Sequence, residues 1–464
     1  MPGVRLGRQG VGRFVIGGIA PAPVLLVNPL VAILGPSTTQ MNSAYSTGSS
    51  TQKVYTKANG PHFWAQAMSA RFRLPVWRAA YNSRGYVGYN YGYNSVPIAT
   101  QDDWIPTIIA SPAQIVVWNS GRGSGDVDSP KTVSDYCDPV KTGLLALKAA
   151  GKIVVWENLW MRHTSAGGDW ASGGWSRQLV LDINAHMLPW CLANGIYHID
   201  VFSAVCDVGP DYNPKTNFVT DDFIHETSTA AYQIALLYDA FYNTVCAPVT
   251  PYDPADGLNV FDYYAFPGTG GVATGNGATG TMPDNMTGTR SSASCAKAVA
   301  FSIFTGPTGR PWVRATLTGA GTVPAAGEGL SIRPTATTIA NRLVIDNWYQ
   351  ARARVSFTDW NGWSSIRLVV EDGAATPIGS CALVAAEAAD GDAPIPGFTG
   401  TKPMAIRPGE GRTITLITPP FKATNTTMGV HVIATWVNAA ISGSAVLETG
   451  DWDVRDCGDP ALWT

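Results

Sequence analysis

Short, uninterrupted runs of apolar residues recur through the first half of the chain. They lie at 30–34, 113–118, 151–156 and 197–202. Strands of a parallel sheet are buried on both faces, so their sequences are almost continuously apolar. Each of the four runs therefore predicts a buried parallel strand.

Longer amphipathic stretches separate or follow these runs. Apolar residues at helical spacing occupy 140–151, 176–195 and 228–245, and the first two stretches end in a glycine where a helix C-cap belongs. Strands that alternate with helices predict an α/β domain with a parallel sheet flanked by helices.

The pattern changes after residue 249. Helical periodicity disappears, and apolar and polar residues alternate at 350–357, 412–418 and 429–437, between turns rich in Gly, Pro and Asp. A period of two is typical of antiparallel strands with one buried face. The second half is therefore predicted to be an all-β sandwich domain of the jelly-roll type.

The chain divides into three predicted parts. Residues 29–248 form the α/β domain and 249–464 the sandwich. Residues 1–28 are basic and rich in Gly and Pro, and prolines interrupt their apolar stretch, which argues against a signal peptide. We interpret 1–28 as an anchoring arm that folds against another protein.

Composition narrows the possible partners. The net charge of −3 over 464 residues gives no electrostatic reason to expect nucleic acid or an anionic membrane as a partner. The seven cysteines form no C-x-x-C pair, so neither a disulfide framework nor a zinc site is indicated, and we expect no metal and no cofactor. The 16 Trp and 17 Tyr suit surfaces that stack on sugars, but large β-rich cores use the same residues.

A serine and an Asp-x-x-His pair flank the α/β domain. Ser37 follows the first predicted strand, and Asp222 and His225 precede the last predicted helix, with Asp221 as an alternative to Asp222. In such a set the carboxylate orients the imidazole, which takes the proton of the serine hydroxyl. The competing interpretation is a helix-capping loop whose acids and histidine are merely solvated.

The order and spacing of these residues resemble the SGNH (GDSL-type) hydrolases. In that family the nucleophile lies in a Gly-Asp-Ser motif after the first strand, and this chain has Gly35-Pro36-Ser37. The resemblance covers about 220 residues. It implies an SGNH-type α/β fold in which Ser37 is the nucleophile, His225 the base and Asp222 its orienting partner.

The resemblance also implies an oxyanion hole. Its donors are the amide of Ser37, the amide of Gly88 (or of Gly85) and a side-chain amide, for which Asn119 is the candidate. The family has a Gly-x-Asn-Asp motif here, but Gly123 occupies the asparagine position of this chain. Losing one such donor typically slows catalysis about 10²- to 10³-fold. The site is therefore either a slow esterase or a retained, inactive fold.

Two aromatic, glycine-rich loops are candidates for substrate binding. Residues 81–95 place several tyrosines among Asn and Gly, and 167–175 contains two tryptophans. Rings in these loops either stack on sugars or belong to loops that only need positive φ angles. The predicted substrate-binding residues are Tyr86, Tyr89, Tyr91, Trp170 and Trp175.

The second half also resembles known modules, more loosely. Residues 257–292 and 442–457 are similar to the first and last parts of jelly-roll, carbohydrate-binding-like modules beside SGNH domains in phage, prophage and gene-transfer-agent particles. This implies a virion spike or fibre protein, made in the bacterial cytoplasm, with a homo-oligomeric state and particle proteins as partners of the arm.

The expected function is a serine esterase that removes O-acyl groups, chiefly acetyl, from a bacterial surface polysaccharide. The alternative is an inactive receptor-binding spike that adsorbs to capsular polysaccharide. A housekeeping lipase or thioesterase fits less well, because it gives the sandwich and the aromatic loops no role.

Overall fold

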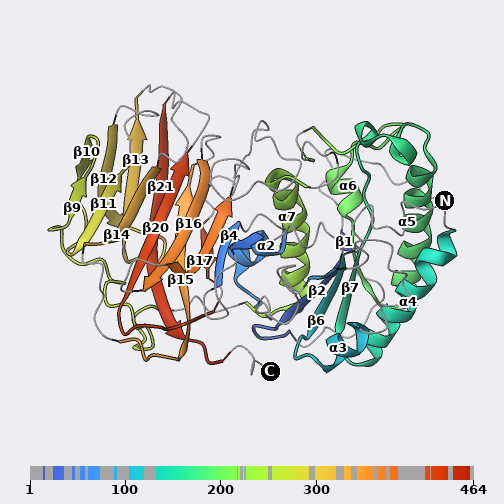
Figure 1. Ribbon diagram of the computed structural model, residues 1–464, viewed down its shortest axis with the longest axis horizontal. Coiled ribbons are helices and arrows are strands. Elements are labelled where there is room, and N and C mark those ends of the chain that lie inside the picture. Colours follow the sequence, from blue (N-terminus) through green and yellow to red (C-terminus); the bar gives the residue numbers. More distant parts are fainter. Residues whose placement is uncertain are drawn as a thin grey trace.

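The computed structural model consists of an α/β unit and an all-β unit, which lie side by side in Figure 1. Among the residues that the structure describes, no helix has both the length and the apolarity needed to cross a membrane. The described residues are 14–15, 25–35, 44–46, 53–57, 61–73, 88–90, 104–119, 132–216, 218–219, 223, 226–248, 253–291, 298–319, 329–335, 342–358, 363–372, 377–384, 413–418, 420–436 and 443–459.

The α/β unit is built on a six-stranded sheet with the order β1-β8-β7-β6-β2-β5. All neighbouring strands are parallel except β1, which pairs antiparallel with β8. The four predicted strands are confirmed as the parallel strands β2, β6, β7 and β8. The bounds are Phe14–Val15 (β1), Val31–Gly35 (β2), Gly88–Asn90 (β5), Ile115–Asn119 (β6), Ile153–Glu157 (β7) and Tyr197–Ile199 (β8).

The last apolar run gives a shorter strand than predicted. β8 ends at Ile199, and Asp200 then caps the short helix α6, Val201–Val205. The Asp200 carboxylate accepts a hydrogen bond from the Ser203 amide at 3.1 Å, which satisfies one of the free amides at the helix start. An apolar run by itself does not distinguish a strand from a buried helix, and here the capping aspartate decides.

The three predicted helices are present as α4, α5 and α7. α4 begins earlier than predicted, because Thr132 and Asp135 form a reciprocal capping box at its N-terminus. α7 begins at its predicted first residue, since Thr227 caps it. The helix bounds are Pro61–Ser69 (α2), Trp104–Ala110 (α3), Val133–Ala149 (α4), Trp175–Ala193 (α5) and Ser228–Val245 (α7), with short 3-10 turns at Thr164–Ala166 (η2) and Gly168–Trp170 (η3).

The helices cover both faces of the sheet. Figure 1 shows α4 and α5 on one side and α2 and α7 on the other. On the α7 side, the ring of Phe241 lies 5.2 Å from the ring of Tyr197 in β8. On the α4 side, the helix approaches β6 so closely that a Cβ on Gly143 would lie 2.7 Å from the Trp118 ring. Only glycine fits at that position without displacing the indole.

The second half of the chain forms two β-sheets. One has the order β10-β12-β13-β21-β15-β18, with β19 paired to β15, and the other has the order β3-β4-β17-β16-β20-β14-β11-β9. The β-rich character of this half is confirmed, whereas the jelly-roll type stays a prediction. The bounds are Val272–Thr274 (β9), Ala278–Gly280 (β10), Met286–Arg290 (β11), Ala298–Thr305 (β12), Pro311–Thr318 (β13), Gly329–Pro334 (β14), Trp348–Phe357 (β15), Trp363–Asp372 (β16), Pro377–Val384 (β17), Ile414–Ile417 (β18), Phe421–Lys422 (β19), Met428–Trp436 (β20) and Ser444–Asp456 (β21).

Side chains of the two sheets share one apolar core. Every second residue of β15 is buried, as its alternating sequence predicts. Gly288 of β11 lies against the ring of Phe301 in β12 of the other sheet, where a Cβ would come within 2.9 Å of the ring. The two sheets therefore pack face to face.

One hairpin of the sandwich comes from the first half of the chain. β3 (Ala44–Ser46) and β4 (Lys53–Lys57) form it, and β4 pairs in parallel with β17. These strands follow β2 in sequence but belong to the eight-stranded sheet. The proposed division at residue 249 remains a prediction about domains, but sheet membership does not follow it at this hairpin.

The N-terminal segment also contacts the α/β unit. β1 pairs with β8, and the amide of Leu26 donates to the carbonyl of Val245 at 2.9 Å. The Leu26 carbonyl in turn accepts from Ala247 at 2.8 Å. Part of the segment that we interpreted as an arm is therefore bonded to this chain's own sheet and last helix. An anchoring role for 1–28 remains a prediction.

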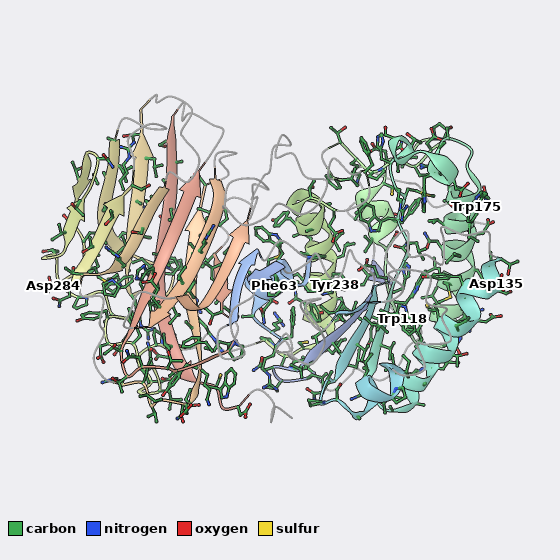
Figure 2. All side chains as sticks on the ribbon, viewed as in Figure 1. Phe63, Trp118, Asp135, Trp175, Tyr238 and Asp284 are labelled. Carbon is green, nitrogen blue, oxygen red and sulfur yellow. The ribbon has the colours of Figure 1, made fainter. Side chains whose placement is uncertain are left out.

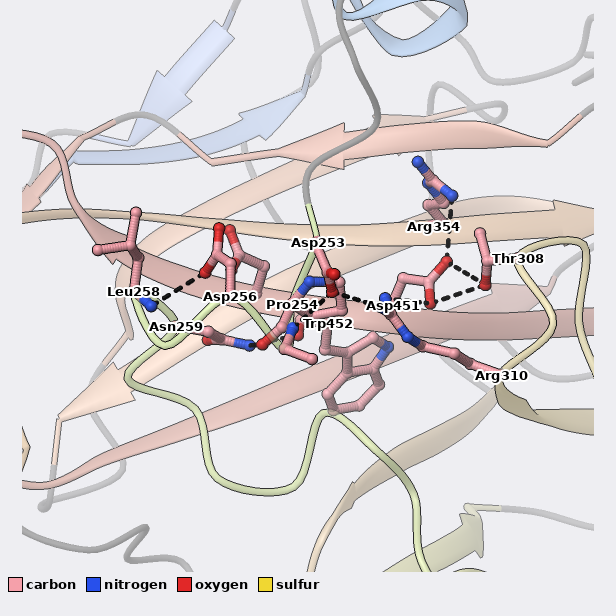
Figure 3. Close-up of polar contacts among 12 residues, drawn as sticks. Asp253, Pro254, Asp256, Leu258, Asn259, Thr308, Arg310, Arg354, Asp451 and Trp452 are labelled. Atoms are coloured by element: carbon pink, nitrogen blue, oxygen red, sulfur yellow. Dashed lines mark hydrogen bonds and ion pairs between the residues drawn. The ribbon is translucent and has the colours of Figure 1, made fainter.

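The stretch that joins the two halves is fixed to β21 (Figure 3). Asn259 is buried, and its side-chain amide donates to the carbonyls of Pro254 and Trp452 at 3.2 and 3.0 Å. Its side-chain oxygen accepts from the amides of Phe261 and Val454, each at 2.9 Å. The connection is therefore part of the sandwich and not a free linker.

A buried carboxylate stabilises the same region. Asp451 is inaccessible to solvent and has a left-handed backbone, with φ 51°. It accepts hydrogen bonds from the Thr308 hydroxyl at 2.9 and 3.0 Å and from Arg354 at 3.1 Å (Figure 3). Arg310, which pairs with Asp253 of the connection, lies 3.9 Å from the same carboxylate. Buried charge is expensive to leave unpaired, so these cations hold the carboxylate in place.

Candidate active site

The carboxyl ends of the parallel strands lie in one row across the sheet. Gly35 of β2 is paired with Asn90 of β5, and Asn119 of β6 is paired with Glu157 of β7, which in turn faces Ile199 of β8. β2 has β5 on one side and β6 on the other, so the strand order reverses at this strand. Open α/β sheets bind their ligands at such a reversal, outside the carboxyl ends of the strands.

The predicted catalytic residues Ser37, Asp222 and His225 lie outside the described residues, as does Asp221. Gly35, two residues before the serine, ends β2 at the reversal.

The loop that contains Asp222 and His225 has two described anchor points. Val219 and Glu226 form an antiparallel bridge across it. Between them, the carbonyl of Phe223 accepts a hydrogen bond from the amide of His163 at 3.3 Å, and the two rings stack with centroids 5.4 Å apart. The loop is therefore attached to the segment that follows β7, and it leads directly into the capped start of α7.

The predicted oxyanion-hole residues fall in different places. Gly88 begins β5 and is paired with Ile33, two residues before the row at the strand ends. Asn119 is the last residue of β6 and lies in the row itself. Gly85 and Gly123 lie outside the described residues, and the roles of all these groups remain predictions.

A buried carboxylate in this row escaped the sequence reasoning. Glu157 is 1% exposed, and its Oε2 accepts a hydrogen bond from the hydroxyl of Tyr238 in α7. Burial and the neighbouring carboxylate both raise the pKa of Tyr238 well above its usual value. The available signal was an acidic residue directly after a predicted buried strand, at the sheet edge where α/β sites lie.

Tyr238 also contacts a buried histidine. The ring of His62, in the first turn of α2, lies 4.3 Å from that of Tyr238. Neither ring nitrogen has a hydrogen-bond partner among the described residues, and burial lowers the pKa of His62 to about 3. The imidazole is therefore neutral at physiological pH. Figure 2 shows Tyr238 and the neighbouring Phe63 where α2 and α7 meet.

A second polar network connects the segments after β7 and β8. The side-chain amide of Asn158 donates to Asp200 at 2.8 Å, and its oxygen accepts from the amide of Phe202 at 2.9 Å. The hydroxyl of Ser203 donates to the other oxygen of Asp200 at 2.6 Å. These bonds make the carboxyl edge of the sheet a rigid support for the loops above it.

Trp170, which is predicted to bind sugar, is 3% exposed, and the guanidinium of Arg162 lies over its ring at 5.0 Å. In this arrangement the residue packs within its loop, and its sugar-binding role stays a prediction. Trp175 is half-buried at the start of α5 (Figure 2). Tyr89 lies in β5, and Tyr86 and Tyr91 lie outside the described residues.

Titratable groups elsewhere do not form a metal centre in the described part of the chain, where no group of three or more His, Cys, Asp and Glu side chains converges. Cys137, Cys191, Cys206 and Cys246 are buried free thiols, and Cys457 is a half-buried one.

No family model and no curated protein matches the chain. Solved structures of GDSL-type hydrolases are similar to about half of it. A catalytic mutant of an acetylxylan esterase from Geobacillus stearothermophilus has 12% identity and a TM-score of 0.34, covering 49% of this chain and 99% of that one. An α/β hydrolase from the metagenome of Lake Arreo has 13% identity and a TM-score of 0.34, covering 48% and 99%. A GDSL-like lipase from Bacteroides thetaiotaomicron has 15% identity and a TM-score of 0.31, covering 47% and 88%.

Proposed function

We propose that this protein is an SGNH-type serine esterase that removes O-acyl groups, chiefly acetyl, from a bacterial surface polysaccharide. The observation that carries the proposal is the position of Gly35. It ends the strand at which the sheet order reverses, and Ser37 follows two residues later. Open α/β sheets bind their ligands at the point where the strand order reverses. A serine that follows the strand at this point is therefore a candidate to meet the substrate.

The attachment of the Asp222–His225 loop adds support. The loop is bonded to the segment after β7 through Phe223 and leads into α7. β7 ends at the same edge of the sheet as β2, the strand that Ser37 follows in sequence. A serine, an imidazole and a carboxylate at one edge would supply the nucleophile, the base and the orienting group of acyl transfer.

In the proposed reaction the Ser37 oxygen attacks the ester carbonyl while His225 takes its proton. Asp222 holds the imidazole in the required tautomer and stabilises the imidazolium. Backbone and side-chain amides near Ser37 stabilise the oxyanion. His225 then gives the proton to the leaving sugar oxygen, which departs as a free hydroxyl. Water, deprotonated by His225, hydrolyses the acyl-enzyme and releases the carboxylic acid and free serine.

The wider context of the proposal comes from the sequence. The sandwich would hold the polysaccharide, and the protein would act as an oligomeric spike or fibre on a phage-like particle. An inactive adsorption spike is the second candidate. The feature that favours it is Gly123, which stands where the resembled family has an oxyanion-stabilising asparagine.

The test is hydrolysis of a small acetyl ester by wild type, Ser37→Ala and Gly123→Asn, with binding to acetylated polysaccharide measured alongside. We expect Ser37→Ala to abolish turnover and leave binding intact, and wild-type activity to rise with pH through about 6.5 as the imidazole becomes neutral. Gly123→Asn should raise the rate, because an oxyanion donor is worth about 2.7–4 kcal/mol of barrier. Wild type no faster than Ser37→Ala would rule out the esterase in favour of the adsorption spike.

A further inference from the structure

The loop that follows α6 contains a tyrosine in a strained backbone conformation. Tyr212 has a left-handed backbone, with φ 47°, and its side chain is half-buried. A left-handed backbone is costly for a bulky residue, and residues held in such conformations concentrate at active sites and ligand-binding sites. A functional reason for this tyrosine is therefore to be sought in what its ring contacts and in where its loop lies.

We propose that Tyr212, with Phe202 behind it, is the aromatic platform that binds the sugar ring of the acylated substrate. The proposal deepens the esterase function proposed above and rests on it. The rings of the two residues lie 5.6 Å apart at an interplanar angle of 51°. An aromatic ring stacks on the apolar face of a sugar, and a tyrosine hydroxyl can also exchange a hydrogen bond with a sugar hydroxyl.

Phe202 is fixed at the ends of the parallel strands. It lies in α6, directly after β8, and its amide donates to the side-chain oxygen of Asn158 at 2.9 Å. Asn158 follows Glu157, the last residue of β7. Phe202 therefore lies at the carboxyl edge of the sheet, where open α/β sheets bind their ligands.

The residues on either side of Tyr212 are bonded to the loop that follows β7. The carboxylate of Asp211 accepts a hydrogen bond from the hydroxyl of Ser172 at 2.7 Å. The side-chain oxygen of Asn213 accepts from the amide of Thr164 at 2.9 Å. Because both neighbours are held, the surrounding structure keeps Tyr212 in its strained conformation.

A buried arginine of α5 supports the same arrangement. Arg177 is 5% exposed, and its guanidinium donates to the carbonyls of Arg162 and Trp170 at 2.9 and 3.2 Å. It also donates to the side-chain oxygen of Asn213 at 3.4 Å. One side chain therefore joins the loops that follow β7 and β8. A site that is ordered before binding loses less conformational entropy when the ligand arrives.

Other aromatic residues of these loops are covered. Nζ of Lys215 lies over the ring of Phe218 at 5.6 Å, and Trp170 is buried beneath Arg162. Among the described residues, no cation lies over the ring of Tyr212 and nothing bonds to its hydroxyl. Tyr212 is therefore the ring of this edge that is best placed to take a ligand.

Two substitutions separate the ring from the backbone conformation. Asparagine tolerates a left-handed backbone, so Tyr212→Asn removes the ring and keeps the loop. Tyr212→Phe keeps the ring and removes the hydroxyl. Tyr263→Asn is a matched control, because Tyr263 is also half-buried, with its ring 6.1 Å from that of Phe261, but lies in the all-β unit.

The experiment measures the kinetics of the full-length variants on ethyl acetate and on acetylated cello-, xylo- and chito-oligosaccharides. We expect Tyr212→Asn to lower kcat/KM on at least one oligosaccharide by about tenfold more than on ethyl acetate, through a higher KM. Tyr212→Phe should lose less than Tyr212→Asn. Tyr263→Asn should affect the oligosaccharides and ethyl acetate alike.

Equal losses of Tyr212→Asn on ethyl acetate and on every oligosaccharide would overturn the proposal. Since asparagine relieves the strain, Tyr212→Asn should melt no lower than Tyr263→Asn, and a lower melting temperature would mean that the ring only packs the loop. If Tyr212→Asn does not fold, Tyr212→Gly, which suits the same backbone, replaces it.

Failure of the esterase function is seen separately, as wild type that turns over no faster than Ser37→Ala. Calorimetric binding of the same oligosaccharides then decides the role of Tyr212. Binding by wild type that weakens about tenfold in Tyr212→Asn, and not in Tyr263→Asn, would support the platform. Equal binding by the two variants, or no binding by wild type, would overturn it.

Discussion

The hydroxyl of Tyr238 donates a hydrogen bond to Oε2 of Glu157, and both side chains are buried. Tyr242, one turn further along the same helix, has a buried hydroxyl with no partner among the described residues. These two buried tyrosines of α7 therefore differ: the hydroxyl of Tyr238 binds a carboxylate, and that of Tyr242 has no partner among the described residues.

This pair allows a controlled measurement. Tyr238→Phe removes a donor from a buried carboxylate, which should lower the free energy of unfolding by about 1–3 kcal/mol. Tyr242→Phe removes a hydroxyl that was buried without a partner, so it should be neutral or stabilising. Chemical denaturation of the two variants checks this. Equal losses would mean that the bond to Glu157 contributes nothing.

The buried histidine of α2 should make the protein sensitive to acid. The pKa of His62 is about 3 in the folded protein and about 6.5 in the unfolded chain. Between these values the unfolded state binds more protons, so stability falls as pH falls through this window. The slope from one such group is at most about 1.4 kcal/mol per pH unit.

His62→Phe should therefore flatten the dependence of unfolding free energy on pH between about 6 and 4. His186→Phe is the control, because His186 is exposed on α5. Urea unfolding at several pH values gives the two slopes. A slope that His62→Phe leaves unchanged would contradict the assignment of a neutral, buried imidazole.

The connection between the two halves should contribute to the free energy of unfolding. Asn259 makes four hydrogen bonds, and each such bond contributes about 0.5–1.5 kcal/mol net. Asn259→Ala should therefore destabilise the protein by at least about 2 kcal/mol.

Asn347→Ala is a matched control, since Asn347 donates one side-chain hydrogen bond at 3.0 Å to the exposed Asp456. It should cost less than about 1 kcal/mol. Thermal unfolding of both variants makes the comparison. A similar loss in both would show that the connection is not held by Asn259.

Deletions at the N-terminus should show whether residues 1–28 stabilise the α/β unit or act only as an anchoring arm. Removing 1–28 takes away β1 and the bonds of Leu26 to Val245 and Ala247. A loss of about 1 kcal/mol or more corresponds to a melting temperature lower by at least about 1 °C. Removing only 1–12 keeps these residues and should leave the melting temperature unchanged. If neither deletion changes the melting temperature, residues 1–28 contribute nothing to stability, and the whole segment is better interpreted as an arm.

The sequence by itself determined the framework of the α/β unit. Continuous apolar runs indicate burial on both faces, and this pattern predicted β2, β6, β7 and the position of β8, although β8 is shorter than its run. Alternation likewise predicted β15, β18 and β20, and the helical spacing that begins at residue 228 predicted α7. These signals are local, and local patterns are sufficient where one residue's surroundings are set by its near neighbours.

Only the tertiary structure decided which distant segments meet. β4 pairs with β17 more than 300 residues later, and no period within either strand specifies that partner. Trp170 lies in a loop whose composition suits a sugar platform, but the approach of Arg162 buries it. Glu157 became a candidate functional residue because Tyr238 and the strand ends surround it. Pairing, burial and hydrogen bonding of this kind depend on contacts between residues far apart in sequence, and a single sequence gives the pattern of each segment without its partner.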